Sequence, residues 1–126
     1  MLSLEGQVAI ITGGAQGIGE GICEVFCKAG ATVALWDVRD SGAETAEKIK
    51  ARGGKIFFQK VDITNRTAVD AAVAEIIEGY GKIEILINNA GVLRDRSFLK
   101  MTQEEWDTVI NVNLSSLFTT TQAVLP

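Results

Sequence analysis

The sequence predicts an α/β fold with a doubly wound parallel sheet, because short apolar runs alternate strictly with helical stretches and a glycine-rich turn joins the first run to the first helix. Strands are expected at residues 7–12, 32–37, 55–61 and 83–88. All four runs are largely apolar on both faces, as in a sheet that helices cover on both sides. With right-handed crossovers, the usual doubly wound topology gives the strand order 3-2-1-4.

Three helices are expected between the strands, over residues 17–29, 41–52 and 66–78. Their apolar residues recur at three- and four-residue spacing. In the second helix Glu44 precedes Lys48 by four residues, which favours an ion pair on its exposed face. Each helix is expected to end at a glycine that suits a C-cap, namely Gly30, Gly53 and Gly79.

A further helix is expected to begin at the capping box of residues 102–105 and to run, with a break near residues 111–113, to the end of the chain. No fifth strand follows, so the strand at 83–88 would be an open edge. We therefore expect one domain over residues 1–126, cut off within its last helix. That helix carries an apolar stripe without a predicted partner, formed by Leu114, Leu117, Phe118, Thr121 and Leu125.

The composition of the chain argues against several classes of function. The chain has 126 residues, a net charge of −4 and no histidine, which argues against nucleic-acid binding and against a Ser-His-Asp triad. No apolar run is long enough to span a membrane, and the first basic residue is Lys28, so we expect a cytoplasmic protein without a signal peptide. Cys23 and Cys27 lie one helical turn apart and favour buried reduced thiols; a two-thiolate metal site is the alternative.

The turn after the first strand has the chemistry of a phosphate-binding loop. Residues 12–19 read T-G-x-x-x-G-x-G, with Gln16 and Ile18 between the glycines. Gly13 permits the tight turn, Gly17 lets a diphosphate approach the backbone, and Gly19 brings the helix close to the strand. A glycine-rich turn without a ligand is the alternative.

Asp37 ends the second strand, 18 residues after Gly19. This is the position of an acid that accepts hydrogen bonds from an adenosine ribose. Because a carboxylate there repels a 2′-phosphate, the sequence favours NAD over NADP. Two alternatives remain: Asp37 can merely cap a turn, and Arg39 leaves room for NADP.

With Asp62 after the third strand and Asn88-Asn89-Ala90-Gly91 after the fourth, the chain resembles the short-chain dehydrogenase/reductase family, whose members are oxidoreductases with a Rossmann-type fold. The resemblance implies that Asp62 meets the adenine amino group and that Ile63 lies against the ring. It also implies that Asn88 braces the central strands, that Asn89, Ala90 and Gly91 belong to the cofactor site, and that Asn113 is the catalytic asparagine.

Local structure could explain several of these residues without a ligand. Asp62 could belong only to the capping turn of the next helix, and Asn88 and Asn89 could be turn residues. Asn113 could be a helix breaker at a kink.

The chain departs from the family in lacking a Tyr-x-x-x-Lys pair. Family members use a Tyr-x-x-x-Lys pair and a serine, whereas Tyr80 is the single tyrosine here and has Glu84 four residues later. We expect Tyr80 to lie in the turn before the fourth strand, and we expect these 126 residues to be inactive. Residues 94–102 resemble a stretch of 3-oxoacyl reductases that act on thioesters; a solvated basic loop is the alternative.

The leading hypothesis is the cofactor-binding half of an NAD-dependent oxidoreductase that transfers a hydride between nicotinamide and a ketone or secondary alcohol, with a 3-oxoacyl thioester as one candidate. The alternative is a non-catalytic nucleotide-binding or protein-interaction module that associates through the open fourth strand and the last helix. Either way, we expect a homo-oligomer or another protein partner.

Overall fold

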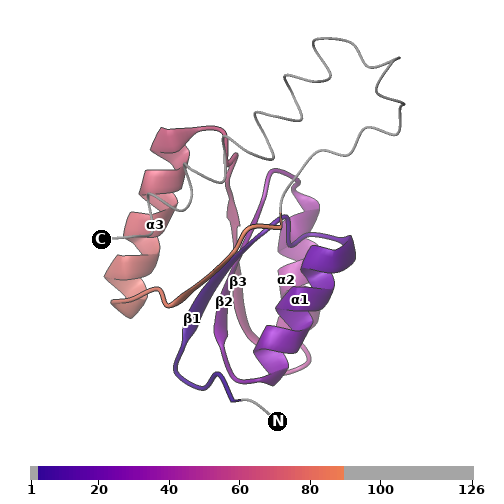
Figure 1. Ribbon diagram of the computed structural model, residues 1–126. Helices are drawn as coiled ribbons and strands as arrows, with labels where there is room; N and C mark the ends of the chain where they lie inside the picture. The colour runs from indigo at the N-terminus through magenta and orange to yellow at the C-terminus, as the bar shows by residue number, and fades with distance from the viewer. Residues whose placement is uncertain (1–2, 90–126) are drawn as a thin grey trace, which may run out of the picture.

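The computed structural model describes residues 3–89, which form a four-stranded parallel sheet flanked by helices (Figure 1). The strand order is β3-β2-β1-β4, which confirms the predicted order 3-2-1-4. The helix expected from residue 102 and its apolar stripe lie outside the described residues. The elements are β1 (Val8–Thr12), α1 (Gly17–Lys28), β2 (Thr32–Asp37), α2 (Ser41–Lys50), β3 (Lys55–Lys60), α3 (Arg66–Tyr80) and β4 (Ile85–Ile87).

All strand pairs are parallel, so the carboxyl ends of the four strands meet at one edge of the sheet. In the centre, Ala9 of β1 pairs with Val33 of β2 and with Ile85 of β4. Helices α1 and α2 cover one face of the sheet, and α3 covers the other (Figure 1). This is the arrangement in which ligands bind at the carboxyl edge, beside the central strand.

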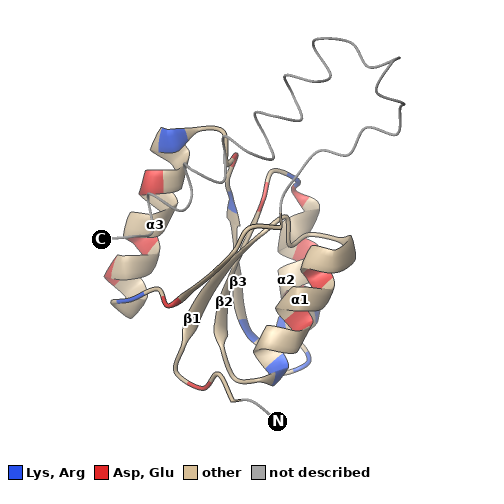
Figure 2. Ribbon diagram, viewed as in Figure 1, with Lys and Arg blue, Asp and Glu red and all other residues tan. Residues whose placement is uncertain are grey.

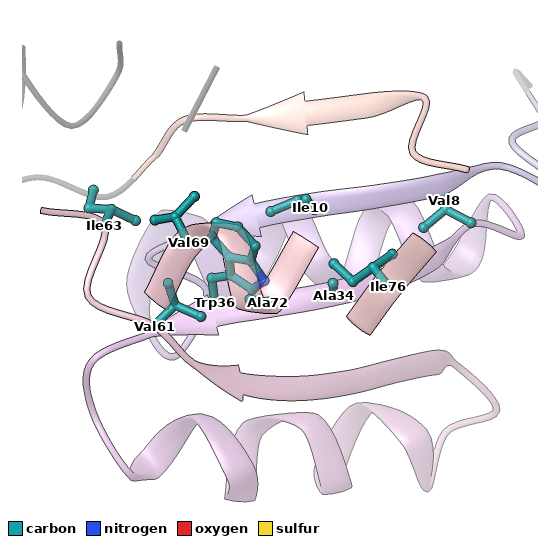
Figure 3. Packing of buried hydrophobic residues seen from close by; sticks show 9 residues of the cluster. All are labelled: Val8, Ile10, Ala34, Trp36, Val61, Ile63, Val69, Ala72 and Ile76. Carbon is teal, nitrogen blue, oxygen red and sulfur yellow. The ribbon is translucent and has the colours of Figure 1, made fainter. Parts of the chain in front are cut away.

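The alternating side chains of β1 divide the core into two clusters. Val8 and Ile10 pack on the α3 side, whereas Ile11 packs on the side of α1 and α2. Trp36 is fully buried in the first cluster, where Val69 of α3 also packs (Figure 3). This tryptophan is therefore a core residue.

Ion pairs join α1 to α2 and to the turn that follows α2. Lys48 binds Glu20 at 2.7 Å, and Arg52 binds Glu24 at 2.9 Å. The predicted pair between Glu44 and Lys48 is wrong, because the neighbouring helix brings a closer carboxylate to the Lys48 ammonium group. Figure 2 shows the charged residues spread over the helices, while the turn between β1 and α1 carries none.

Helix α3 is longer than predicted. It continues through Gly79 to Tyr80 and is capped by Gly81, whose φ of 80° is left-handed. Tyr80 is thus the last helical residue rather than part of a turn, and its ring stacks on Phe57 with a centroid distance of 5.5 Å. Within residues 3–89, no helix has the length and apolarity needed to cross a membrane.

Strand β4 is shorter than the predicted 83–88, since it spans only Ile85–Ile87. Just before it, the Glu84 backbone N–H donates to the Val8 carbonyl, and a Glu84 carboxylate oxygen accepts from the Val8 N–H. A side chain therefore replaces one backbone partner at this end of the strand pair.

Candidate functional site

The turn between β1 and α1 lies at the carboxyl edge of the sheet and takes its shape from three glycines. Gly13 and Gly17 have φ values of 67° and 62°, in the left-handed region that other residues adopt at a cost. A Cβ on Gly19 would collide with the Gly13 carbonyl oxygen, so helix α1 can approach β1 this closely only with glycine there. The predicted geometric roles of Gly13 and Gly19 are confirmed.

The outer face of this turn is open. Gln16, Gly17 and Ile18 are exposed, and a Cβ on Gly17 would meet no described atom within 4 Å. Gln16 is the N-cap of α1, but its side chain makes no capping hydrogen bond within the described part of the chain. The first backbone N–H groups of α1 therefore have no partner in their own helix, which leaves donors and a positive dipole end for an anion.

Asp37 ties the end of β2 to the glycine turn. Its residue is 6% exposed, and its carboxylate accepts from the Ala15 N–H and from the Arg39 N–H, each at 3.0 Å. The bond to Arg39 is the turn cap that the sequence left open as an alternative. The bond to Ala15 places a negative charge directly beside the turn, and the predicted contact with a ribose stays a prediction.

Asn89 ties the end of β4 to the same turn. Its backbone N–H donates to the Thr12 hydroxyl at 2.9 Å, and its side-chain Nδ2 donates to the Gly13 carbonyl at 3.2 Å. The Thr12 hydroxyl in turn donates to the Ile87 carbonyl. Asn89 thus braces the ends of β1 and β4, and the bracing role that the resemblance assigns to Asn88 stays a prediction.

Asp62 and Ile63 follow β3 at the same edge. The Asp62 carboxylate accepts from the backbone N–H and the hydroxyl of Thr64, at 2.9 and 2.6 Å, so the local capping turn is formed. Asp62 is exposed, whereas Ile63 is 7% exposed and packs in the core with Trp36. Little of Ile63 is left for an adenine ring, and both adenine contacts stay predictions. Ala90, Gly91, Asn113 and residues 94–102 lie outside the described residues.

Comparison with known proteins gives this turn its context. The sequence profile described as short chain dehydrogenase matches residues 7–126. The chain belongs to the short chain dehydrogenase family. Members of this family bind nicotinamide cofactors, and the described residues fall in its N-terminal cofactor-binding portion.

Individual relatives of this short chain dehydrogenase are matched along about half of their own length. The chain is 43% identical to Oxidoreductase UcpA of Salmonella typhimurium and 39% identical to 3-oxoacyl-[acyl-carrier-protein] reductase FabG of Thermotoga maritima; the matches cover 100% and 99% of this chain but 48% and 51% of those proteins. A solved structure titled "Crystal structure of gox2181" is 31% identical with a TM-score of 0.92, over 97% of this chain and 48% of that one. The chain thus spans about half the length of these relatives.

Two residues that support the glycine turn of this short chain dehydrogenase were not predicted from the sequence, namely Gly14 and Thr45. A Cβ on Gly14 would lie 2.8 Å from Leu35 Cγ, so a fourth glycine is needed for packing against β2. Thr45 of α2 donates a 2.7 Å hydrogen bond to the Ala15 carbonyl. A signal for Thr45 was present, because it follows Gly42 by three residues and precedes Ile49 by four, which places it on the buried face of α2.

The two cysteines lie away from the turn. Burial raises the pKa of the Cys23 thiol to about 12 and that of Cys27 to about 11, so both are protonated at neutral pH. Cys27 lines a cavity of about 530 Å³ at the opposite edge of the sheet, together with Lys28 and Arg52. Among the described residues, no group of three acidic, cysteine or histidine side chains is placed to hold a metal ion.

Proposed function

We propose that this chain binds a nicotinamide dinucleotide at the glycine turn, as the N-terminal cofactor-binding portion of an oxidoreductase. The observation that carries the proposal is the exposed start of α1 after β1, where, within residues 3–89, Gln16 makes no side-chain capping bond and the backbone at Gly17 is bare. Two large apolar side chains remain exposed at this edge, Ile18 at 78% and Val38 at 54%. They offer apolar surface for the flat rings of such a cofactor.

The charge at the glycine turn also suits a dinucleotide with a free ribose. The Asp37 carboxylate touches the turn through the Ala15 N–H, so a ligand bound there meets a negative charge. A ribose with free hydroxyls can donate to that carboxylate, whereas a 2′-phosphate is repelled by it. We therefore propose NAD as the preferred cofactor.

For the whole protein, we propose hydride transfer between the nicotinamide and a ketone or secondary alcohol, with a 3-oxoacyl thioester as one candidate substrate. The bound dinucleotide supplies or accepts the hydride. The relative named as a 3-oxoacyl-[acyl-carrier-protein] reductase supports that substrate class. Because Tyr80 is the single tyrosine and has Glu84 rather than lysine four residues later, we propose that these 126 residues bind the cofactor without turnover.

The test is a fluorescence titration of the 126-residue chain with NADH and, separately, with NADPH, followed by an assay with a simple 3-oxoacyl ester. We expect saturable NADH binding, NADPH binding at least about tenfold weaker, and no turnover. Absence of NADH binding would contradict the proposal and favour a protein-interaction module. Tighter binding of NADPH would overturn the cofactor preference, and turnover would overturn the proposed inactivity.

The sequence also predicts self-association, which remains a proposal. Sedimentation of the same sample tests it, since a dimer or larger species is expected at micromolar concentration. A stable dilute monomer would contradict that expectation without affecting the dinucleotide site.

A further inference from the structure

Thr45 occupies an unusual place on α2. Of the four residues of this helix that the structure describes as buried, Gly42, Ala46 and Ile49 are apolar and Thr45 alone is polar. A hydroxyl on a buried helix face needs a partner, because burying it without a hydrogen bond is unfavourable. Threonine in a helix often bonds the carbonyl one turn earlier in its own helix.

Here the Thr45 hydroxyl instead crosses to the glycine turn. It donates to the Ala15 carbonyl at 2.7 Å, a buried contact between residues 30 positions apart. The close packing of α2 on the sheet makes this reach possible. A Cβ on Gly42 would collide with the Phe58 ring of β3, so glycine at this position lets the helix lie near the sheet.

Ala15 is consequently held by both of its backbone polar groups. Its N–H donates to Asp37 Oδ2 at 3.0 Å, and its carbonyl accepts from Thr45. In a planar trans peptide, the carbonyl of one residue and the N–H of the next point in opposite directions. Fixing the Ala15 carbonyl toward α2 therefore fixes the Gln16 N–H away from α2, on the exposed part of the turn.

We propose that Thr45 is a positioning residue of the dinucleotide site, which aims the Gln16 backbone N–H at the diphosphate by holding the Ala15 carbonyl. The inference rests on the proposed function. Without the hydroxyl, the Ala15 carbonyl is buried without its partner, and rotation of the peptide group toward another donor turns the Gln16 N–H away from its position. Thr45 would thus act on the ligand through the backbone and not by contact.

The experiment compares NADH affinity in four variants of the 126-residue chain, measured by fluorescence well below the unfolding transition. Thr45→Val and Thr45→Ala remove the hydroxyl, and Thr45→Ser keeps it. Ile49→Val is the matched control, because it weakens packing on the same buried face of α2 without a bond to the turn. We expect NADH binding to weaken about three- to tenfold in the first two variants, and to stay within about twofold of the original in the last two.

A second measurement follows the backbone amide of Gln16 by NMR in a ¹⁵N-labelled chain titrated with ADP as a diphosphate probe. We expect a large shift of this amide in the original chain and in Thr45→Ser, and a reduced shift in Thr45→Val and Thr45→Ala. If Thr45→Val fails to fold, the comparison of Thr45→Ala with Thr45→Ser still tests the proposal.

The outcomes separate the two proposals. If the original chain binds NADH and the hydroxyl-free variants bind it equally well, Thr45 has no positioning role and the proposed function stands. Equal weakening in Ile49→Val and Thr45→Val would reduce Thr45 to ordinary packing and overturn the inference. If the original chain binds neither NADH nor ADP, the proposed function fails, and the role of Thr45 fails with it.

Discussion

The Asp37 carboxylate accepts a 3.0 Å hydrogen bond from the backbone N–H of Ala15, so the acid that ends β2 is part of the structure of the glycine turn. Its second oxygen accepts from the Arg39 N–H. One carboxylate thus links the turn after β1 to the turn after β2, and a ligand at the glycine turn meets a charge that is already fixed in place. Substitutions at Asp37 should change both stability and ligand choice.

Asp37→Asn keeps the shape of the side chain and removes its charge. We expect the preference for NADH over NADPH to fall at least about tenfold, because a charged acceptor contributes about 1.5–3 kcal/mol to a hydrogen bond. The free energy of unfolding should fall as well, since an amide has one acceptor oxygen for the two N–H groups that Asp37 binds. Parallel titrations with both cofactors measure the ratio. Asp40→Asn changes the net charge equally at an exposed residue paired with Lys60, and it should leave the ratio unchanged.

Gly19 and Gly21 make a matched pair on α1. A Cβ on Gly19 would collide with the Gly13 carbonyl and lie 2.6 Å from Asn89 Nδ2, whereas a Cβ on Gly21 would meet no described atom within 4 Å. We expect Gly19→Ala to lower the free energy of unfolding by about 2–3 kcal/mol through overpacking. Gly21→Ala should raise it by about 0.5–1 kcal/mol, because alanine is the better helix former. Urea unfolding measures both, and equal effects would show that α1 does not need its close approach to β1.

The thiols should be unreactive in the folded chain. With its pKa raised by burial to about 11, Cys27 is almost fully protonated at pH 7.5, and Cys23 more so. Alkylation by iodoacetamide at this pH should be about a hundredfold slower than in the urea-unfolded chain, because only the thiolate reacts. Rapid labelling of the folded chain would show that the helix α1 opens or that the thiols are not buried.

The same shifts predict how stability depends on pH. Each pKa is higher in the folded chain than the ordinary value of 9.0, so protonated thiols favour the folded state. Their contribution is complete below about pH 9 and is lost as the pH rises toward about 11 and 12. Urea unfolding at several pH values from 8 upward should show this loss. The double variant Cys23→Ala with Cys27→Ala should show a smaller loss, since it lacks both thiols.

The sequence predicted the strand order and the three helices because these depend on patterns within short segments: apolar runs, helical spacing and glycines. It missed features that arise only when distant segments meet. Lys48 prefers Glu20 of α1 to Glu44 of its own helix, and Asn89 bonds Thr12 and Gly13, which are more than 70 residues away in the sequence. Such contacts depend on how elements pack, which local periodicity does not encode.

Gly17 and Gly81 offer a test of the glycine turn that separates strain from ligand binding. Both have left-handed φ values, 62° and 80°, and a Cβ on either would meet no described atom within 4 Å. Replacement by alanine should therefore cost a similar amount at each site, about 1–2 kcal/mol of unfolding free energy, because only the backbone conformation is penalised. Gly81 ends α3 at the opposite edge of the sheet from the turn, so Gly81→Ala should keep its NADH affinity. Gly17→Ala should lose at least about tenfold in affinity, because the added methyl group occupies the face that a diphosphate must approach. If the two variants bind NADH equally well, the bare backbone at Gly17 does not face the ligand, and the binding site must lie elsewhere on the chain.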